Sequence, residues 1–105
     1  MFLNILKNSK DALIERDIKN PTIKIEAFED EKSVTLTIED NGGGIDVKPL
    51  NKIFEAYFST KNQNKGTGIG LYMSKMIVEK SLKGEIRVEN IHKGVRFSIT
   101  IAKNI

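Results

Sequence analysis

The residues with the clearest potential for chemistry are Asp40 and the glycines that follow it, in the stretch Asp40-Asn41-Gly42-Gly43-Gly44. An aspartate that ends a strand is held in place, and its carboxylate can accept a hydrogen bond from the exocyclic amine of a nucleotide base. Glycines permit positive φ and let the backbone approach a flat ligand closely. Because Asp, Asn and Gly are also common turn residues, an ordinary strand-ending turn is the simpler interpretation of this segment taken alone.

A second glycine-rich stretch, Gly66-Thr67-Gly68-Ile69-Gly70, precedes a predicted helix. Unpaired N–H groups and the positive end of the helix dipole lie at such a start, and glycines give a phosphate access to them. The stretch is not a P-loop, because no Gly-Lys-Ser/Thr follows at the required spacing. It is also a poor dinucleotide-binding fingerprint, since residue 71 is leucine and residues 62–65 form a polar loop instead of a strand. A flexible helix start and a phosphate-binding loop therefore both stay open.

Asn4 and Asn8 are four residues apart in a predicted helix, so both project from one face, which Lys7 and Asp11 flank. An amide oxygen is a hard neutral ligand that suits Mg²⁺, which keeps several waters and bridges phosphates. Ordinary surface asparagines are the alternative at either position.

Two lysines, Lys61 and Lys65, precede the second glycine stretch and could fold over a triphosphate or simply be solvated. Phe54, Tyr57 and Phe58 could clamp this segment onto the body of the domain. Phe54 suits a place in the core at least as well. We expect the polar residues of this segment to be mobile.

Hydrophobic periodicity predicts the elements that position these residues. The predicted elements are a helix over 2–16, strands over 23–27 and 34–38, a short helix over 50–55, a helix over 71–81, and strands over 86–88 and 95–101. The alternation over 23–27 is typical of a half-buried strand, and Met73, Met76, Ile77 and Lys80 form the predicted stripe of the second long helix. This order predicts a single sheet with helices on one face.

The composition limits the class of protein. The chain has 105 residues, enough for one domain, and its 39% hydrophobic and 30% charged residues are typical of a globular protein. No apolar run approaches the roughly 18 residues of a membrane span, and the start does not resemble a secretory signal. The lack of cysteine excludes disulfides and agrees with a reducing cytoplasm. The net charge is +3, but the lysines are scattered among glutamates, so we do not expect nucleic-acid binding.

Four of these segments, in their order along the chain, strongly resemble the N box, G1 box, F box and G2 box of histidine-kinase ATP-binding domains. The segments are Asn4–Asn8, Asp40–Gly44, Ile53–Phe58 and Gly66–Leu71. The resemblance covers nearly the whole chain and implies a single domain over residues 1–105. It implies the Bergerat (GHKL) fold, an α/β two-layer sandwich with a mixed, mainly antiparallel sheet, which is shared with gyrase, mismatch-repair and heat-shock chaperone ATPases.

The resemblance implies that the domain binds ATP with Mg²⁺. Asn8 would ligate the Mg²⁺ with support from Asn4, and Asp40 would accept a hydrogen bond from the adenine amine. The γ-phosphate would pass to a histidine of a partner helix, mainly through positioning and charge neutralisation. A lid over about residues 46–66 would be anchored by Phe54 and Phe58. The other residues expected to contact the nucleotide are Lys7, Asp11, Gly42, Gly44, Ile45, Tyr57, Lys61, Lys65, Gly66, Thr67, Gly68, Gly70 and Leu71.

The first residues depart from the family pattern. Residues 1–105 hold neither the strand and helical turn that family domains carry before the N box nor the phosphoacceptor helix, so we expect a truncated domain. We expect the sheet to expose an edge that could pair with another copy. The single histidine, His92, is expected at the surface. The partners implied are therefore the phosphoacceptor histidine domain of the parent kinase and a downstream response regulator, and the chain alone should hold no catalytic residue beyond those that position ATP.

Asn4 and Asp11 bear on the choice between subfamilies. Hydrolysing relatives place a glutamate at the position of Asn4, and an amide cannot take the proton of an attacking water. Many members place a basic residue where Asp11 stands, so Lys7 or Lys61 would have to meet the phosphates. A GHKL ATPase, a serine kinase relative and a non-catalytic dimeric interaction module stay open as alternatives. We expect a cytoplasmic domain without direct membrane contact, whether or not its parent protein is membrane-anchored.

Overall fold

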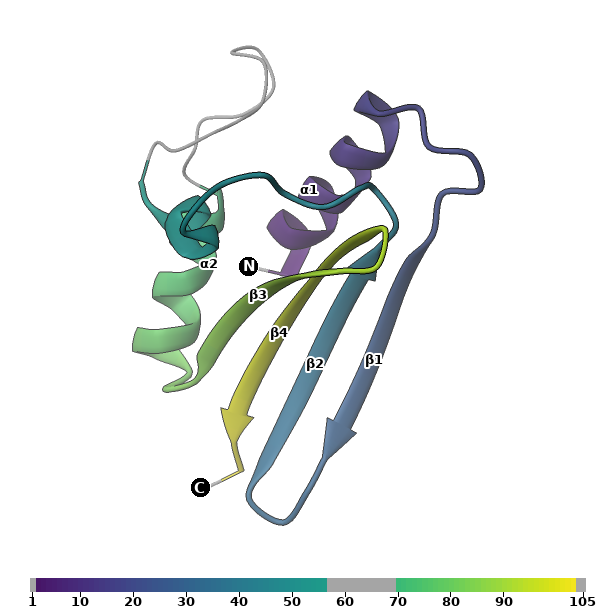
Figure 1. Cartoon of the computed structure of the whole chain (residues 1–105). Coiled ribbons are helices and arrows are strands. Elements are labelled where there is room, and N and C mark those ends of the chain that lie inside the picture. The colour runs from purple at the N-terminus through teal and green to yellow at the C-terminus, as the bar shows by residue number, and fades with distance from the viewer. Residues whose placement is uncertain (1, 57–69, 104–105) are drawn as a thin grey trace.

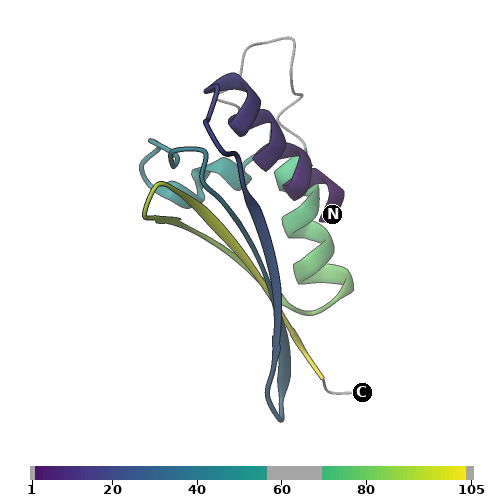
Figure 2. The same ribbon diagram turned by 90° about the vertical axis from the view of Figure 1, so that its right-hand side faces the viewer.

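The protein is a two-layer α+β sandwich in the computed structural model, which describes residues 2–56 and 70–103. Four strands form one sheet, and helices α1 and α2 lie side by side over one of its faces (Figures 1 and 2). The elements are α1 (Phe2–Glu15), β1 (Ile23–Glu29), β2 (Ser33–Asp40), the 3₁₀-helix η1 (Leu50–Phe54), α2 (Gly70–Met76), its π-helical continuation η2 (Ile77–Ser81), β3 (Glu85–Ile91) and β4 (Gly94–Ala102). The expected fold class is confirmed.

The strand order is β1-β2-β4-β3, and all three pairings among the described strands are antiparallel. The two hairpins, β1–β2 and β3–β4, meet through β2 and β4 at the centre of the sheet. Asp30 closes the first hairpin, because one of its carboxylate oxygens accepts hydrogen bonds from the amides of Lys32 (2.8 Å) and Ser33 (2.7 Å). Those two bonds favour the charged form and lower the pKa of Asp30 from 3.8.

The core lies between the central strands and the two helices. Alternate residues of β4 turn inward as the periodicity predicts, and Phe97 and Ile99 are almost fully buried. Ile5 of α1 and Val78 of η2 meet them from the helical layer. The buried hydrophobic residues of this cluster are Ile5, Ile38, Ile53, Phe54, Val78, Ile86, Val95, Phe97 and Ile99.

The stripe predicted for the second long helix is wrong at its two ends, whereas Met76 and Ile77 are half-buried. Met73 is 43% exposed and Lys80 is exposed, whereas Ser74 and Val78 are fully buried. Ser74 is small, and its hydroxyl donates a hydrogen bond to the carbonyl of Gly70, so the buried hydroxyl has a partner within its own helix. The helix then widens to an i→i+5 bond from Leu82 N–H to the Ile77 carbonyl, which rotates the residues after 77 around the axis.

The expectation that β1 is half-buried is also wrong for most of its length. Ile25 is 48% exposed and Phe28 is 53% exposed, while Ile23 stays half-buried. β1 is an edge strand, and the helices cover the middle of the sheet. The far end of the β1–β2 hairpin extends past them (Figure 2). Alternation along a strand cannot show whether another layer reaches it.

Candidate nucleotide-binding site

The carboxylate of Asp40 is held at the end of β2, where the strand gives way to the glycine turn. Asp40 is only 8% exposed. Its Oδ1 accepts a hydrogen bond from Gly42 N–H at 2.9 Å, and its Oδ2 accepts none from the described residues. A carboxylate oxygen has room for more than one donor. The side chain is thus fixed in direction and can still receive an amine.

The glycines of the turn meet two different requirements. Gly43 and Gly44 have φ of +100° and +83°, which L side chains rarely adopt. Gly42 instead needs a small side because α1 lies against it. A Cβ there would be 3.3 Å from Ala12 Cβ and 3.2 Å from Asp40 Oδ1. Helix α1 therefore packs directly on the turn that presents Asp40.

The same helix reaches the start of α2 with its other end. The side-chain amide of Asn4 donates to the Gly70 carbonyl at 3.5 Å, and a Cβ on Gly70 would be 3.5 Å from Asn4 Cγ. Asn8 is half-buried one turn before Ala12, so it lies between these two contacts along the helix. Asp11 is half-buried and Lys7 is exposed. The fold therefore brings the asparagine helix, the Asp40 turn and the beginning of α2 together.

Phe54 is a core residue, which was one of the two interpretations open from the sequence. It is 5% exposed and packs edge-to-face on Phe97, with ring centroids 6.2 Å apart and planes at 79°. Lys75 Nζ lies 5.7 Å from the Phe54 ring centroid, close enough for a cation–π contact. Ile45 and Leu71 pack against the edge of the core. Phe54 thus ties η1 to the sheet immediately before the undescribed residues 57–69.

Several of the predicted site residues have no described placement. Those that lie outside the described residues are Tyr57, Phe58, Lys61, Lys65, Gly66, Thr67 and Gly68. Within residues 2–56 and 70–103, no group of three or more His, Cys, Asp or Glu side chains could hold a metal. A single amide oxygen such as that of Asn8 still suits Mg²⁺, which is bound by few protein ligands together with waters and phosphates.

Three side chains to which the sequence assigned no role hold the turn and the residues beside it. The Arg16 guanidinium donates to the Gly42 carbonyl at 2.8 Å. The Asn41 side chain accepts a hydrogen bond from Thr22 N–H and donates one to the Asn20 carbonyl. The Asn90 side chain makes hydrogen bonds with both the N–H and the carbonyl of Ile45. The two residues of each of these hydrogen bonds are 19 to 45 positions apart in sequence, so no local motif predicts the contacts.

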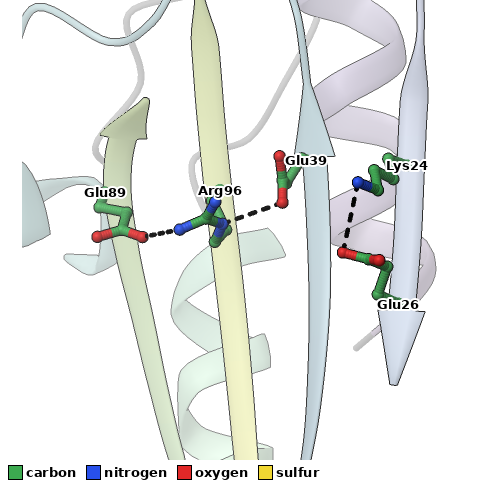
Figure 3. A network of polar contacts seen from close by, with 5 residues as sticks. All are labelled: Lys24, Glu26, Glu39, Glu89 and Arg96. Atoms are coloured by element: carbon green, nitrogen blue, oxygen red, sulfur yellow. Dashed lines mark hydrogen bonds and ion pairs between the residues drawn. The ribbon is translucent and has the colours of Figure 1, made fainter. Parts of the chain in front are cut away.

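A polar ladder crosses the face of the sheet opposite the helices (Figure 3). Arg96 on β4 donates to Glu39 of β2 and to Glu89 of β3, which are its direct neighbours in the sheet register. The pKa of Arg96 is raised, mainly by its hydrogen bond to Glu89 and then by that to Glu39. The ladder crosses the end of β2 that carries Asp40. Its charges face away from the glycine turn (residues 40–44), because neighbouring residues of a strand point to opposite faces.

A family model described as histidine kinase-, DNA gyrase B-, and HSP90-like ATPase matches residues 1–105. The chain belongs to this family. It is 38% identical over 104 residues to sporulation kinase A of Bacillus subtilis, covering 98% of this chain and 16% of that protein. It is 34% identical over 104 residues to the two-component sensor PprA of Pseudomonas aeruginosa, covering 96% of this chain and 11% of that protein.

Solved structures agree with this membership. The nucleotide-free catalytic domain of the histidine kinase ThkA matches with a TM-score of 0.71 and 31% identity, over 93% of this chain and 67% of that one. The mycobacterial sensor histidine kinase MprB matches with a TM-score of 0.78, over 95% of this chain and 68% of that one, and at 23% identity it shows the fold alone. The resemblance to histidine-kinase ATP-binding domains is confirmed. Among the described helices, none has both the length and the apolar character needed to cross a bilayer.

Proposed function

We propose that this domain binds Mg-ATP and that, in its parent protein, it donates the γ-phosphate to a histidine of a phosphoacceptor domain. The observation that carries the proposal is the buried Asp40 carboxylate, fixed beside a glycine turn and packed against the helix of Asn4 and Asn8. The chain spans 11% and 16% of the two curated relatives named above, so the acceptor would come from outside it. The phosphate would then pass to a response regulator.

The described residues would divide the work of holding the nucleotide. Asp40 would accept a hydrogen bond from the adenine amine, and the small surfaces of Gly42 and Gly44 would let the base lie close to the backbone. Asn8 would ligate Mg²⁺, which neutralises phosphate charge when bound. Gly70, at the start of α2, would leave room for phosphate beside Asn4. Lys7, Asp11, Ile45, Phe54 and Leu71 would line or support this site.

Transfer to an amino-acid acceptor is favoured over hydrolysis by the side chain at position 4. Hydrolysis needs a general base for water, and an amide cannot take that proton. Asn4 instead donates its amide proton to the Gly70 carbonyl, which ties the helix to the start of α2. Because ATP is the proposed substrate, the proposal places the domain in the cytoplasm, whether or not its parent protein is anchored in a membrane.

Calorimetry with Mg-ATP tests the binding step. Ligand at about 100 times its Kd should stabilise the fold by about 2.7 kcal/mol, so a thermal shift should accompany the heat of binding. Asp40→Asn should abolish both signals, because an amide oriented by Gly42 N–H presents its NH₂ group to the donor of adenine. Glu39→Gln is the matched control, since it changes the neighbouring carboxylate, which bonds Arg96 on the other face. Equal loss in both variants, or no binding by the wild type, would refute the proposal.

Radiolabelled ATP tests the transfer step. The domain is mixed with the separately produced phosphoacceptor domain of the same kinase, and labelled histidine is measured as acid-labile phosphate. We expect transfer that depends on Mg²⁺ and on Asp40. Release of free phosphate without a labelled acceptor, at the rate of a true ATPase, would support hydrolysis instead.

We also propose that two copies of the domain associate through the outer edge of β1. Among the described residues, only β2 pairs with β1, and the outer edge of β1 carries exposed Ile25. An antiparallel pair centred on Ile25 would set Lys24 opposite Glu26 of a second copy, and Glu26 opposite its Lys24. A pair centred on Lys24 or on Glu26 would set like charges opposite each other, which is unfavourable.

Charge exchange tests this pairing. In sedimentation velocity over a concentration series, Lys24→Glu and Glu26→Lys should each weaken the dimer. The double variant should recover it, because the opposite charges meet again with their places exchanged. A wild type that stays monomeric, or single variants that associate as strongly as the wild type, would refute this register.

A further inference from the structure

We infer that Asn90 is a positioning residue for the glycine turn (residues 40–44), although it need not touch the nucleotide. This inference rests on the proposed function. The Asn90 side chain accepts a hydrogen bond from Ile45 N–H at 2.8 Å and donates one to the Ile45 carbonyl at 3.0 Å. One amide thus satisfies both backbone groups of one residue, 45 positions away. A side chain with only a donor or only an acceptor could not make this pair of bonds.

The clamped residue directly follows the three consecutive glycines of the turn. Gly44 precedes Ile45 with φ of +83°, and a Cβ on Gly44 would be 3.1 Å from Asn90 Oδ1. Gly42, Gly43 and Gly44 are consecutive, and glycine loses more conformational freedom on ordering than any other residue. The asparagine therefore holds the exit of the segment that most needs an external constraint.

The rest of the β3–β4 connection backs the same turn. Gly43 N–H donates to the Lys93 carbonyl at 3.0 Å. Gly94 lies so close to the backbone of Asp40 that a Cβ there would overlap the Asp40 carbonyl oxygen. Residues 90–94 thus contact the turn at its beginning, middle and end. Asn90 is the member of this set whose contribution comes from its side chain, so it can be changed without altering the backbone.

A positioning role differs from a general structural role in what it should affect. Asn90 is exposed, so its truncation leaves no core cavity and should change global stability little. Its loss should instead lower the fraction of molecules whose turn is ready for the base. The apparent Kd rises in inverse proportion to that fraction. With two hydrogen bonds of modest net strength removed, we expect Asn90→Ala to weaken Mg-ATP binding about tenfold.

Two variants and one control separate the roles. Asn90→Asp has the same shape and keeps the acceptor, but it loses the donor and sets a carboxylate beside the Ile45 carbonyl, so it should also weaken binding. Thr35→Val is the control, because it removes the Thr35–Thr100 hydroxyl contact (3.1 Å) of the same sheet, near the opposite end of β2. This control should keep the wild-type Kd even if its melting temperature falls.

Calorimetry with Mg-ATP and amide hydrogen exchange without nucleotide complete the test. In Asn90→Ala, we expect the amides of residues 43–45 to exchange faster while those of β2 and β4 stay protected. A Kd within twofold of the wild type, or unchanged exchange at residues 43–45, would overturn the inference. If the wild type itself does not bind Mg-ATP, the proposed function fails, whereas faster exchange in the variant still supports the clamp.

Discussion

Gly42→Ala probes the contact between helix α1 and the turn that presents Asp40. The added Cβ would lie 3.3 Å from Ala12 Cβ, 3.6 Å from Leu13 Cδ2 and 3.2 Å from Asp40 Oδ1. The distances to Ala12 and Asp40 are tighter than ordinary contact, and Gly42 is buried, so the helix or the turn must move by a few tenths of an ångström. Over-packing of this kind typically costs about 1–3 kcal/mol. Because the turn carries Asp40, nucleotide binding should weaken beyond what the lost stability explains.

A double-mutant cycle with Ala12→Gly isolates that contact. Ala12→Gly alone should cost up to about 1 kcal/mol in helix propensity. In the double variant the new methyl at position 42 fills the space left at position 12, so the two losses should fall short of additivity by about 1 kcal/mol. Urea unfolding of the four proteins measures the free energies of unfolding. Strict additivity would refute the idea that α1 and the turn meet at these two residues.

Two further changes test how polar groups are satisfied away from the site. The Ser9 hydroxyl is buried and has no hydrogen-bond partner among the described residues. Ser9→Ala should therefore leave the free energy of unfolding unchanged or raise it. A loss above about 1 kcal/mol would mean that the hydroxyl is bonded. The pKa of Asp30 is lowered from 3.8 by two backbone amides, so its contribution to stability is complete above about 3.8 and is lost as pH falls through the lower folded value. The melting temperature of the wild type should therefore fall more steeply with acid below that pH than that of Asp30→Asn, with Glu31→Gln as control, and parallel curves would contradict this reasoning.

The sequence by itself determined the elements and the composition of the candidate site. Helix α1, both hairpins and the short helix near residue 50 follow from local periodicity and turn residues, because each depends on neighbours a few positions apart. The asparagine pair, the Asp40 turn and the second glycine stretch were recognisable in order along the chain. That order led to the family, which the comparisons confirm.

Only the tertiary structure decided which surfaces meet. It buried Ser74 and Val78 where hydrophobicity favoured Met73 and Ile77, because a small residue and a widened turn change the face that a helix presents. It left most of β1 exposed, because the helical layer covers the centre of the sheet and not this edge. It also brought Asn90 onto Ile45, a contact set by the register of β2, β4 and β3. Local patterns carry no information on such contacts, since their partners come together only when the sheet has formed.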